Sequence, residues 1–163
     1  MINSADQLFM LASQTSGSVY SLWMSSGRPE PPVVLLDSEG EIAKVSETAT
    51  QFLQMALSLA PNWMDCLLGL PGIHGGMSDA PAAEYDMDAM TARIASWRGD
   101  PHPPPISFGM SAEDCAATFV QARAQADLVL ESVGLERLDV KTALAQLWEA
   151  YRSGPRFTPP STE

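Results

Sequence analysis

The chain is poor in the residues on which most catalytic and metal sites depend. Its 163 residues include only two histidines and two cysteines. His74 and His102 lie among glycines and prolines, with no cysteine or acidic residue at a recognisable ligand spacing. Cys66 and Cys115 lie in apolar surroundings, form no CxxC motif and are predicted to be buried thiols. We therefore predict no metal site and no cofactor.

Sequence motifs for catalysis are also missing. The glycine-rich segment at 72–76 matches neither of the phosphate-binding glycine patterns, and no lysine lies near it. The chain has no G-x-S-x-G nucleophile elbow and no Ser-His-Asp order in a supporting frame. We therefore expect no catalytic residue and no enzymatic activity. One alternative stays open, because two of the 20 acidic residues could form an unrecognised carboxylate site in a cleft.

Basic residues are scarce as well. Nine lysines and arginines stand against 20 acidic residues, and the formal net charge is -11. This balance excludes a generic nucleic-acid binder, because the phosphate backbone requires a basic footprint. It also argues against binding to an anionic membrane surface. The negative net charge has two interpretations: it keeps the protein soluble, or it attracts a partner that is itself basic.

Long apolar segments are missing too. No apolar run approaches the length needed to cross a bilayer. Residues 1–6 lack the positively charged start and the apolar core of a secretory signal. The sequence therefore predicts a location in the cytoplasm.

Hydrophobic residues nevertheless make up 45% of the chain, which is enough for a core. In the first 45 residues, short apolar runs alternate with turn signals such as Gly17 and Gly40. This pattern predicts four strands, near residues 8–14, 18–24, 32–37 and 41–45. At Ser46 the period changes to that of a helix from about Glu47 to Ala60, for which Ser46 is the expected N-cap.

Helical patterns dominate the rest of the chain. They fall at Trp63–Leu70, at a stripe of Met87, Met90, Ile94 and Trp97, from Ser111 to about Val133, and from about Asp139 to Arg152. Strands followed by helices are typical of the α+β class. We therefore predict an α+β fold, with an antiparallel β-meander of about four strands followed by four or so helices packed on it.

The predicted domain organisation follows from this order. Residues 1–153 are expected to form a single domain with a helical C-terminal portion at 84–153, and residues 154–163 a flexible tail. The sheet is too small to enclose a core alone. Phe119, Leu144 and Trp148 are therefore predicted to bury one of its faces.

Residues 8–60 resemble the central and C-terminal part of SUKH-superfamily domains. The matching pieces are an aromatic-rich strand after a glycine turn (14–23), an apolar strand and turn (32–41), and the pair Phe52 and Leu53. The resemblance covers about a third of the chain. The family's N-terminal helix and first strand have no room before Leu8, and residues 61–163 resemble no family.

The resemblance implies a non-enzymatic protein-binding domain. Many bacterial members are immunity proteins, which bind and neutralise a toxin, so the implied partner is a toxin domain with a basic surface. An adaptor that docks through its C-terminal helices is the alternative, and homo-oligomerisation is left open. The candidate partner-binding residues are Tyr20, Trp23, Arg28, Glu30, Asp79, Glu84, Asp86 and Asp88. The simpler interpretation of the acidic residues is a solvated helix start. Tyr20 and Trp23 are expected on opposite faces of their strand, one in the core and the other either exposed or covered by a later helix.

Overall fold

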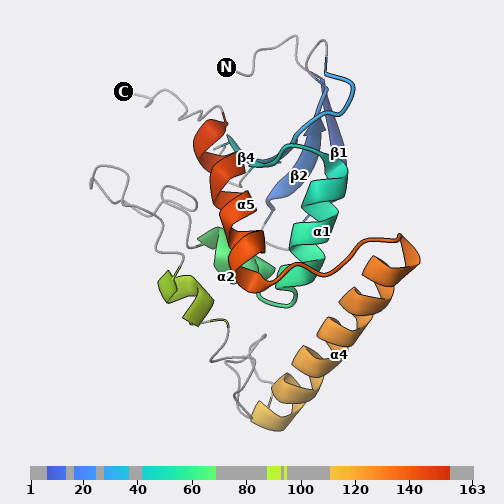
Figure 1. Cartoon of the computed structure of the whole chain (residues 1–163), viewed down its shortest axis with the longest axis vertical. Helices are drawn as coiled ribbons and strands as arrows, with labels where there is room; N and C mark the ends of the chain where they lie inside the picture. The colour runs from blue at the N-terminus through green and yellow to red at the C-terminus, as the bar shows by residue number, and fades with distance from the viewer. Residues whose placement is uncertain are drawn as a thin grey trace. The chain divides into compact units, whose positions relative to one another are not determined.

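The structure is a computed structural model that describes residues 7–13, 17–24, 28–36, 42–68, 88–92, 94 and 111–154 (Figure 1). The chain divides into two compact units. The first unit comprises Met1–Leu53, Leu70–Ala83 and Gln146–Glu163, and the second comprises Gln54–Gly69 and Glu84–Ala145. The prediction of a single domain over 1–153 stays a prediction.

The elements confirm the predicted α+β class. Four strands come first: β1 (Leu8–Ser13), β2 (Val19–Trp23), β3 (Val33–Leu36) and β4 (Ile42–Ser46). The helices follow: α1 (Ala49–Leu59), α2 (Trp63–Leu68), α4 (Ala112–Ser132) and α5 (Val140–Ser153). Residues 88–92 and 94 are also helical, within the predicted stripe, and Met87 and Trp97 lie outside the described residues.

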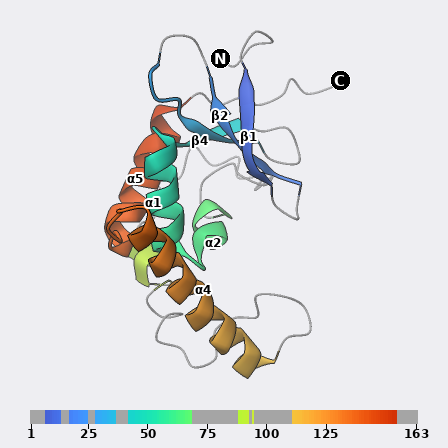
Figure 2. The same ribbon diagram turned by 90° about the vertical axis from the view of Figure 1, so that its right-hand side faces the viewer.

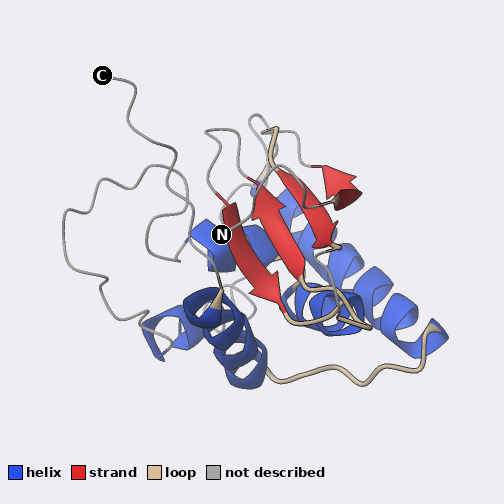
Figure 3. Cartoon of the chain, turned by 90° about the horizontal axis from the view of Figure 1, so that it is seen from above, coloured by secondary structure: helices blue, strands red, loops and turns tan. Residues whose placement is uncertain are grey.

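The sheet belongs to the first unit and is an antiparallel meander in the order β1-β2-β3-β4 (Figure 3). In the register, Phe9 lies opposite Leu22 and Tyr20 opposite Leu35. The continuous apolar run of β3 predicted a strand buried on both faces, and Val33, Val34 and Leu35 are each at most 2% exposed. The first unit therefore has its core around the middle of the sheet.

One aromatic pair in the first unit joins the sheet to α1, and a second lies within α5. The rings of Tyr20 on β2 and Phe52 on α1 have centroids 5.0 Å apart and are tilted by 45°. On α5, the rings of Trp148 and Tyr151 stack at 5.7 Å, and Leu147 is fully buried. Such aromatic pairs add to the free energy gained from burial.

The N-cap of α1 differs from the one predicted. The hydroxyl of Thr48 accepts a hydrogen bond from the backbone N–H of Gln51 at 3.0 Å, and the Gln51 side chain accepts one from the N–H of Glu47 at 2.7 Å. Ser46 instead donates to the Thr48 carbonyl. Ser46 was the wrong cap because β4 extends through it and fixes its backbone as strand. The helix therefore begins two residues later than predicted.

A short segment between α4 and α5 is tied to α1 in the second unit. Arg137 donates to the carbonyl of Ser58 at 3.0 Å and pairs with Asp127. The N–H of Leu138 donates to the Ser58 hydroxyl at 2.9 Å, and Gln54 donates to the Glu136 carbonyl at 2.8 Å. Ser58 is fully buried, so these bonds satisfy polar groups that would otherwise be costly to bury.

Some of the side chains predicted to be in the core are fully buried, and others are half-buried. Cys66 is a fully buried thiol, and Leu144 is fully buried. Phe119 and Trp148 are half-buried. The side chain of Cys115 lies outside the described residues, as does the predicted tail beyond residue 154. The prediction that Phe119, Leu144 and Trp148 cover the sheet stays a prediction.

The predicted helix end at Gly134 gives a first testable prediction. Gly134 has a φ of +69°, its N–H donates to Glu131, and the N–H of Leu135 donates to Leu130, which together form a Schellman motif. A Cβ at this position would meet no heavy atom of the described residues within 4 Å, so only the left-handed backbone opposes a side chain. Gly134→Ala is expected to lower the free energy of unfolding by about 1 kcal/mol. Urea denaturation would measure this decrease. Gly134→Asn should lower the free energy of unfolding by less, because asparagine tolerates the left-handed conformation better than alanine, and equal decreases would contradict this explanation.

Candidate protein-binding surface

The two edges of the sheet differ in their exposure. β1 and β4 are the outer strands, so each pairs with a neighbour on one side only. All six residues of β1 are exposed, whereas four of the five residues of β4 are buried. β1 is therefore the open edge of the sheet, and it lies beside β2 along its length (Figure 2).

The open edge is apolar and lacks the usual protection. β1 reads Leu-Phe-Met-Leu-Ala-Ser, with no charged residue and no proline. Phe9 and Met10 are each 63% exposed. Natural edge strands are normally protected by lysine, proline, bulges or a covering element, because unpaired strand backbone can bind another strand. Only a bulge between Met10 and Ala12 is present in β1. This combination of exposure and composition is typical of a docking site.

A hollow of about 500 Å³ adjoins this edge. It is lined by Gln7, Leu8, Phe9, Leu22 and Met24. Phe9 and Leu22 are directly opposite in the register, so their side chains lie on the same face of the sheet. Met24 is 49% exposed. The hollow could hold the apolar side chains of a bound strand or loop.

The backbone of β1 is oriented for strand addition. The N–H of Met24 donates to the Gln7 carbonyl at 2.8 Å, and the N–H of Trp23 donates to Pro32 at 2.9 Å on the other side of β2. Because the backbone groups of successive residues point to opposite sides of a strand, Leu8 and Met10 direct theirs away from β2. An incoming strand would pair with these groups.

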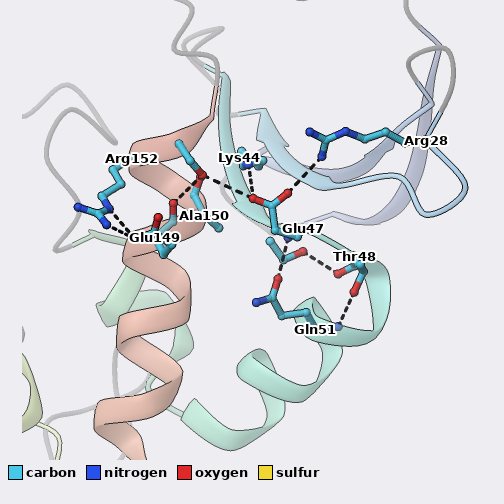
Figure 4. A network of polar contacts seen from close by, with 10 residues as sticks. Arg28, Lys44, Glu47, Thr48, Gln51, Glu149, Ala150 and Arg152 are labelled. Atoms are coloured by element: carbon cyan, nitrogen blue, oxygen red, sulfur yellow. Dashed lines mark hydrogen bonds and ion pairs between the residues drawn. The ribbon is translucent and has the colours of Figure 1, made fainter.

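The opposite edge is closed by a polar network (Figure 4). The ammonium of Lys44, on β4, pairs with Glu47 Oε1, and its side chain is only 6% exposed. Arg28 pairs with Glu47 Oε2 at 3.2 Å, and the Ser153 hydroxyl at the end of α5 lies 3.5 Å from Oε1. Glu47 therefore joins the loop before β3, the strand β4 and the end of α5.

The electrostatics of this network follow from its two cations. The hydrogen bond from Lys44 holds the pKa of Glu47 below its ordinary value, with further lowering by Arg28 and partial opposition from burial. Glu47 is therefore ionised at neutral pH and offsets the charge of the buried Lys44. The network covers the edge of the sheet at β4. β1 is therefore the edge at which a partner strand can pair.

The end of α5 approaches β4 closely, and this gives a second testable prediction. A Cβ at Gly154 would overlap Lys44 Cβ and would lie 3.3 Å from the Ala150 carbonyl oxygen. Lys44 Cβ is attached to strand backbone and cannot move aside easily. Gly154→Ala is therefore expected to lower the free energy of unfolding by about 1–3 kcal/mol. An unchanged urea midpoint would contradict the close approach.

The predicted partner-binding residues lie in different settings. Tyr20 is 5% exposed against Phe52, so its ring is in the core. Trp23 is half-buried, Arg28 and Glu30 are exposed, and Arg28 is paired with Glu47. Asp88 is exposed in the second unit and pairs with Lys141 at 3.0 Å. The other three acidic residues lie outside the described residues: Asp79, Glu84 and Asp86.

Sequence reasoning did not single out Leu8–Leu11 or Met24 as binding residues. β1 was predicted as a strand, but its exposure depends on no element among the described residues covering it. The available signal was an uncharged apolar strand without proline at one end of a predicted meander, which is the pattern of an unprotected edge. Where the structure describes the chain, it contains no group of three or more potential metal ligands.

Among the described helices, none is both long and apolar enough to cross a membrane.

The chain was compared with known families, proteins and structures. No protein-family model, no curated protein and no solved structure matches it.

Proposed function

We propose that this chain is a protein-binding domain that recognises its partner through the open edge of β1. The observation that carries the proposal is the strand itself, which is apolar, uncharged and exposed along all six residues. Phe9 and Met10 are its two most exposed large side chains, and Phe9 lines a hollow of about 500 Å³ together with Met24. Strand addition would combine backbone pairing with anchoring of side chains in this hollow.

The partner is expected to present an extended apolar segment within a basic surface. Apolar residues suit β1 and the hollow, and a basic surround suits a chain with a net charge of -11. Long-range attraction between the two would speed association and select against acidic proteins. Within the first unit, Glu30 is exposed and adds to this acidity, whereas Arg28 is neutralised by Glu47.

The role we propose is that of an immunity-type protein, which binds and neutralises a bacterial toxin. Support comes from the resemblance of residues 8–60 to SUKH domains, from the acidic charge and from the exposed edge. Nuclease toxins are often basic, because they bind phosphate backbones. A protein that blocks such a toxin needs a complementary surface and no catalytic group of its own.

The test is co-purification with the product of the adjacent gene at low and high salt. The proposal expects a complex that survives size-exclusion chromatography, associates more slowly at high salt and suppresses the toxicity of the neighbour on co-expression. Binding by an acidic protein of the same size serves as the control for non-specific attraction. If the neighbouring product is neither bound nor toxic, the immunity role is wrong.

A further inference from the structure

A second apolar surface lies on α4, in the second unit. Val120 is 72% exposed and Leu128 is 58% exposed. Ala117 and Ala124 are also exposed, and the four residues follow one another at spacings of three or four along the helix. Residues at these spacings share one face. We call this set, Ala117, Val120, Ala124 and Leu128, the outer stripe.

The outer stripe faces away from the core of the second unit. Among the described side chains of α4, Ala126 and Leu130 are buried, at 4% and 2% exposure, and Phe119 is half-buried. At 100° per residue these three point to the side of the helix roughly opposite Ala124. The helix therefore has one apolar face that packs against its own unit and another that is exposed in the described part of the chain.

We propose that the outer stripe binds the outer stripe of a second copy of this chain, with the two α4 helices antiparallel and crossing at Ala124. A two-fold axis at Ala124 places Val120 opposite the partner's Leu128, and Leu128 opposite the partner's Val120. The small side chain of Ala124 meets its own equivalent at the crossing, where the two backbones approach most closely. The stripe is thus complementary to itself, as a two-fold interface requires.

The charged residues around the outer stripe favour the antiparallel orientation. Glu113 and Glu131 continue the line of the stripe at its two ends. A parallel pair would place each glutamate against its own equivalent, which like-charge repulsion disfavours. In the antiparallel pair, Glu131 lies opposite the partner's Ala117. Arg123 and Asp127 flank the stripe on one side, so each Arg123 then lies near the partner's Asp127. That Asp127 also pairs with Arg137 of its own chain, and Arg123 adds a second positive charge beside it.

The size of the contact sets the expected affinity. From Glu113 to Glu131 the helix is about 27 Å long at 1.5 Å per residue. One pair of helices of this length is at the small end of specific interfaces. We therefore expect a dimer that dissociates at roughly micromolar concentration. The inference goes beyond the proposed function and does not depend on it, because β1 belongs to the other unit.

The first test is the mass in solution of the full chain as a function of concentration, by sedimentation equilibrium. The wild type should rise from 17.5 kDa toward twice that mass. Ala124→Glu, which places two charges at the crossing, should weaken the dimer at least tenfold. Ala49→Glu makes the same change at an exposed site on α1 and should leave the dimer unchanged. A wild type that stays monomeric, or equal effects of both substitutions, would overturn the proposal.

The second test is cysteine cross-linking, which reports the orientation. Ala124→Cys should give a disulfide-linked dimer on mild oxidation, whereas Val120→Cys and Leu128→Cys, each alone, should not exceed the wild-type control for the native cysteines. Cross-linking of all three would indicate a parallel pair and overturn the orientation. Met10→Pro should dimerise like the wild type. If it is monomeric instead, the copies associate through β1 and the proposal for α4 is wrong.

Discussion

Replacing Met10 with proline is expected to weaken binding of the partner protein at least about 30-fold, equivalent to about 2 kcal/mol. Proline has no backbone N–H, and the N–H of Met10 points away from β2 toward an incoming strand. The pairing of β1 with β2 does not use this group, and edge strands accept proline. Met10 is 63% exposed, so its side chain contributes little to the core. Titration calorimetry against the partner identified by co-purification would measure the affinity.

Met10→Thr is the matched control for strand addition. Threonine favours strands and keeps the backbone N–H, but it removes most of the apolar side chain. We expect an intermediate loss of affinity, because backbone pairing survives. Circular dichroism and urea unfolding should show that both variants keep the sheet. If proline and threonine weaken binding equally, the partner contacts side chains only; if neither has an effect, β1 is not the binding edge.

Replacing Glu47 with glutamine is expected to lower the free energy of unfolding at pH 7 by about 1–3 kcal/mol, the cost of leaving a buried charged group without its partner. The side chain of Lys44 is 6% exposed and pairs with Glu47. Glutamine keeps the shape and an oxygen acceptor but removes the negative charge. Arg28 and Ser153 lose the same partner. Urea unfolding at several pH values would measure the difference.

The pH dependence of this effect has a definite sign. The pKa of Glu47 is lower in the folded chain than in the unfolded chain, where it is about 4.3. The ionised carboxylate therefore stabilises the fold fully above about pH 4.3, and this contribution is lost as the pH falls through the lowered value. The gap between wild type and Glu47→Gln should narrow over this acidic range. A gap that stays constant would show that Glu47 does not act through its charge.

A double substitution separates the charge pair from simple loss of packing. Lys44→Met keeps an unbranched stem of similar length without the ammonium group. In Lys44→Met with Glu47→Gln, no buried charge is left uncompensated, so the double variant should be more stable than the sum of the single losses predicts. Additive losses would mean that Lys44 and Glu47 act independently.

The boundaries of the elements could be predicted closely because their signals are local. β2 and β3 lie within a residue or two of the predicted ranges, and α4 begins after Ser111, whose hydroxyl accepts from the N–H of Asp114. The end at Gly134 follows from a backbone conformation that glycine adopts easily. The start of α1 was predicted less well. Ser46 and Thr48 are both good caps, and the extent of β4 decided between them.

The candidate surface was much harder to predict than the elements. Tyr20 and Trp23 alternate on β2, so the sequence shows that they occupy different faces without showing which face is covered. The ring of Tyr20 is buried because Phe52 of α1 lies 5.0 Å away. The exposure of Phe9 and Met10 likewise depends on what packs beside β1. Hydrophobic character alone therefore did not distinguish a core residue from a binding residue.

The sequence by itself determined the α+β class, the order of strands and helices, most of the helix ends and the acidic charge. Periodicity, caps and composition act over a few residues, so they can be read along the chain. Only the tertiary structure decided that β4 is the closed edge, where Lys44 meets Glu47, and that β1 is the open one. Edge exposure depends on contacts between segments about a hundred residues apart, such as Glu47 with Ser153, and such contacts leave no local pattern.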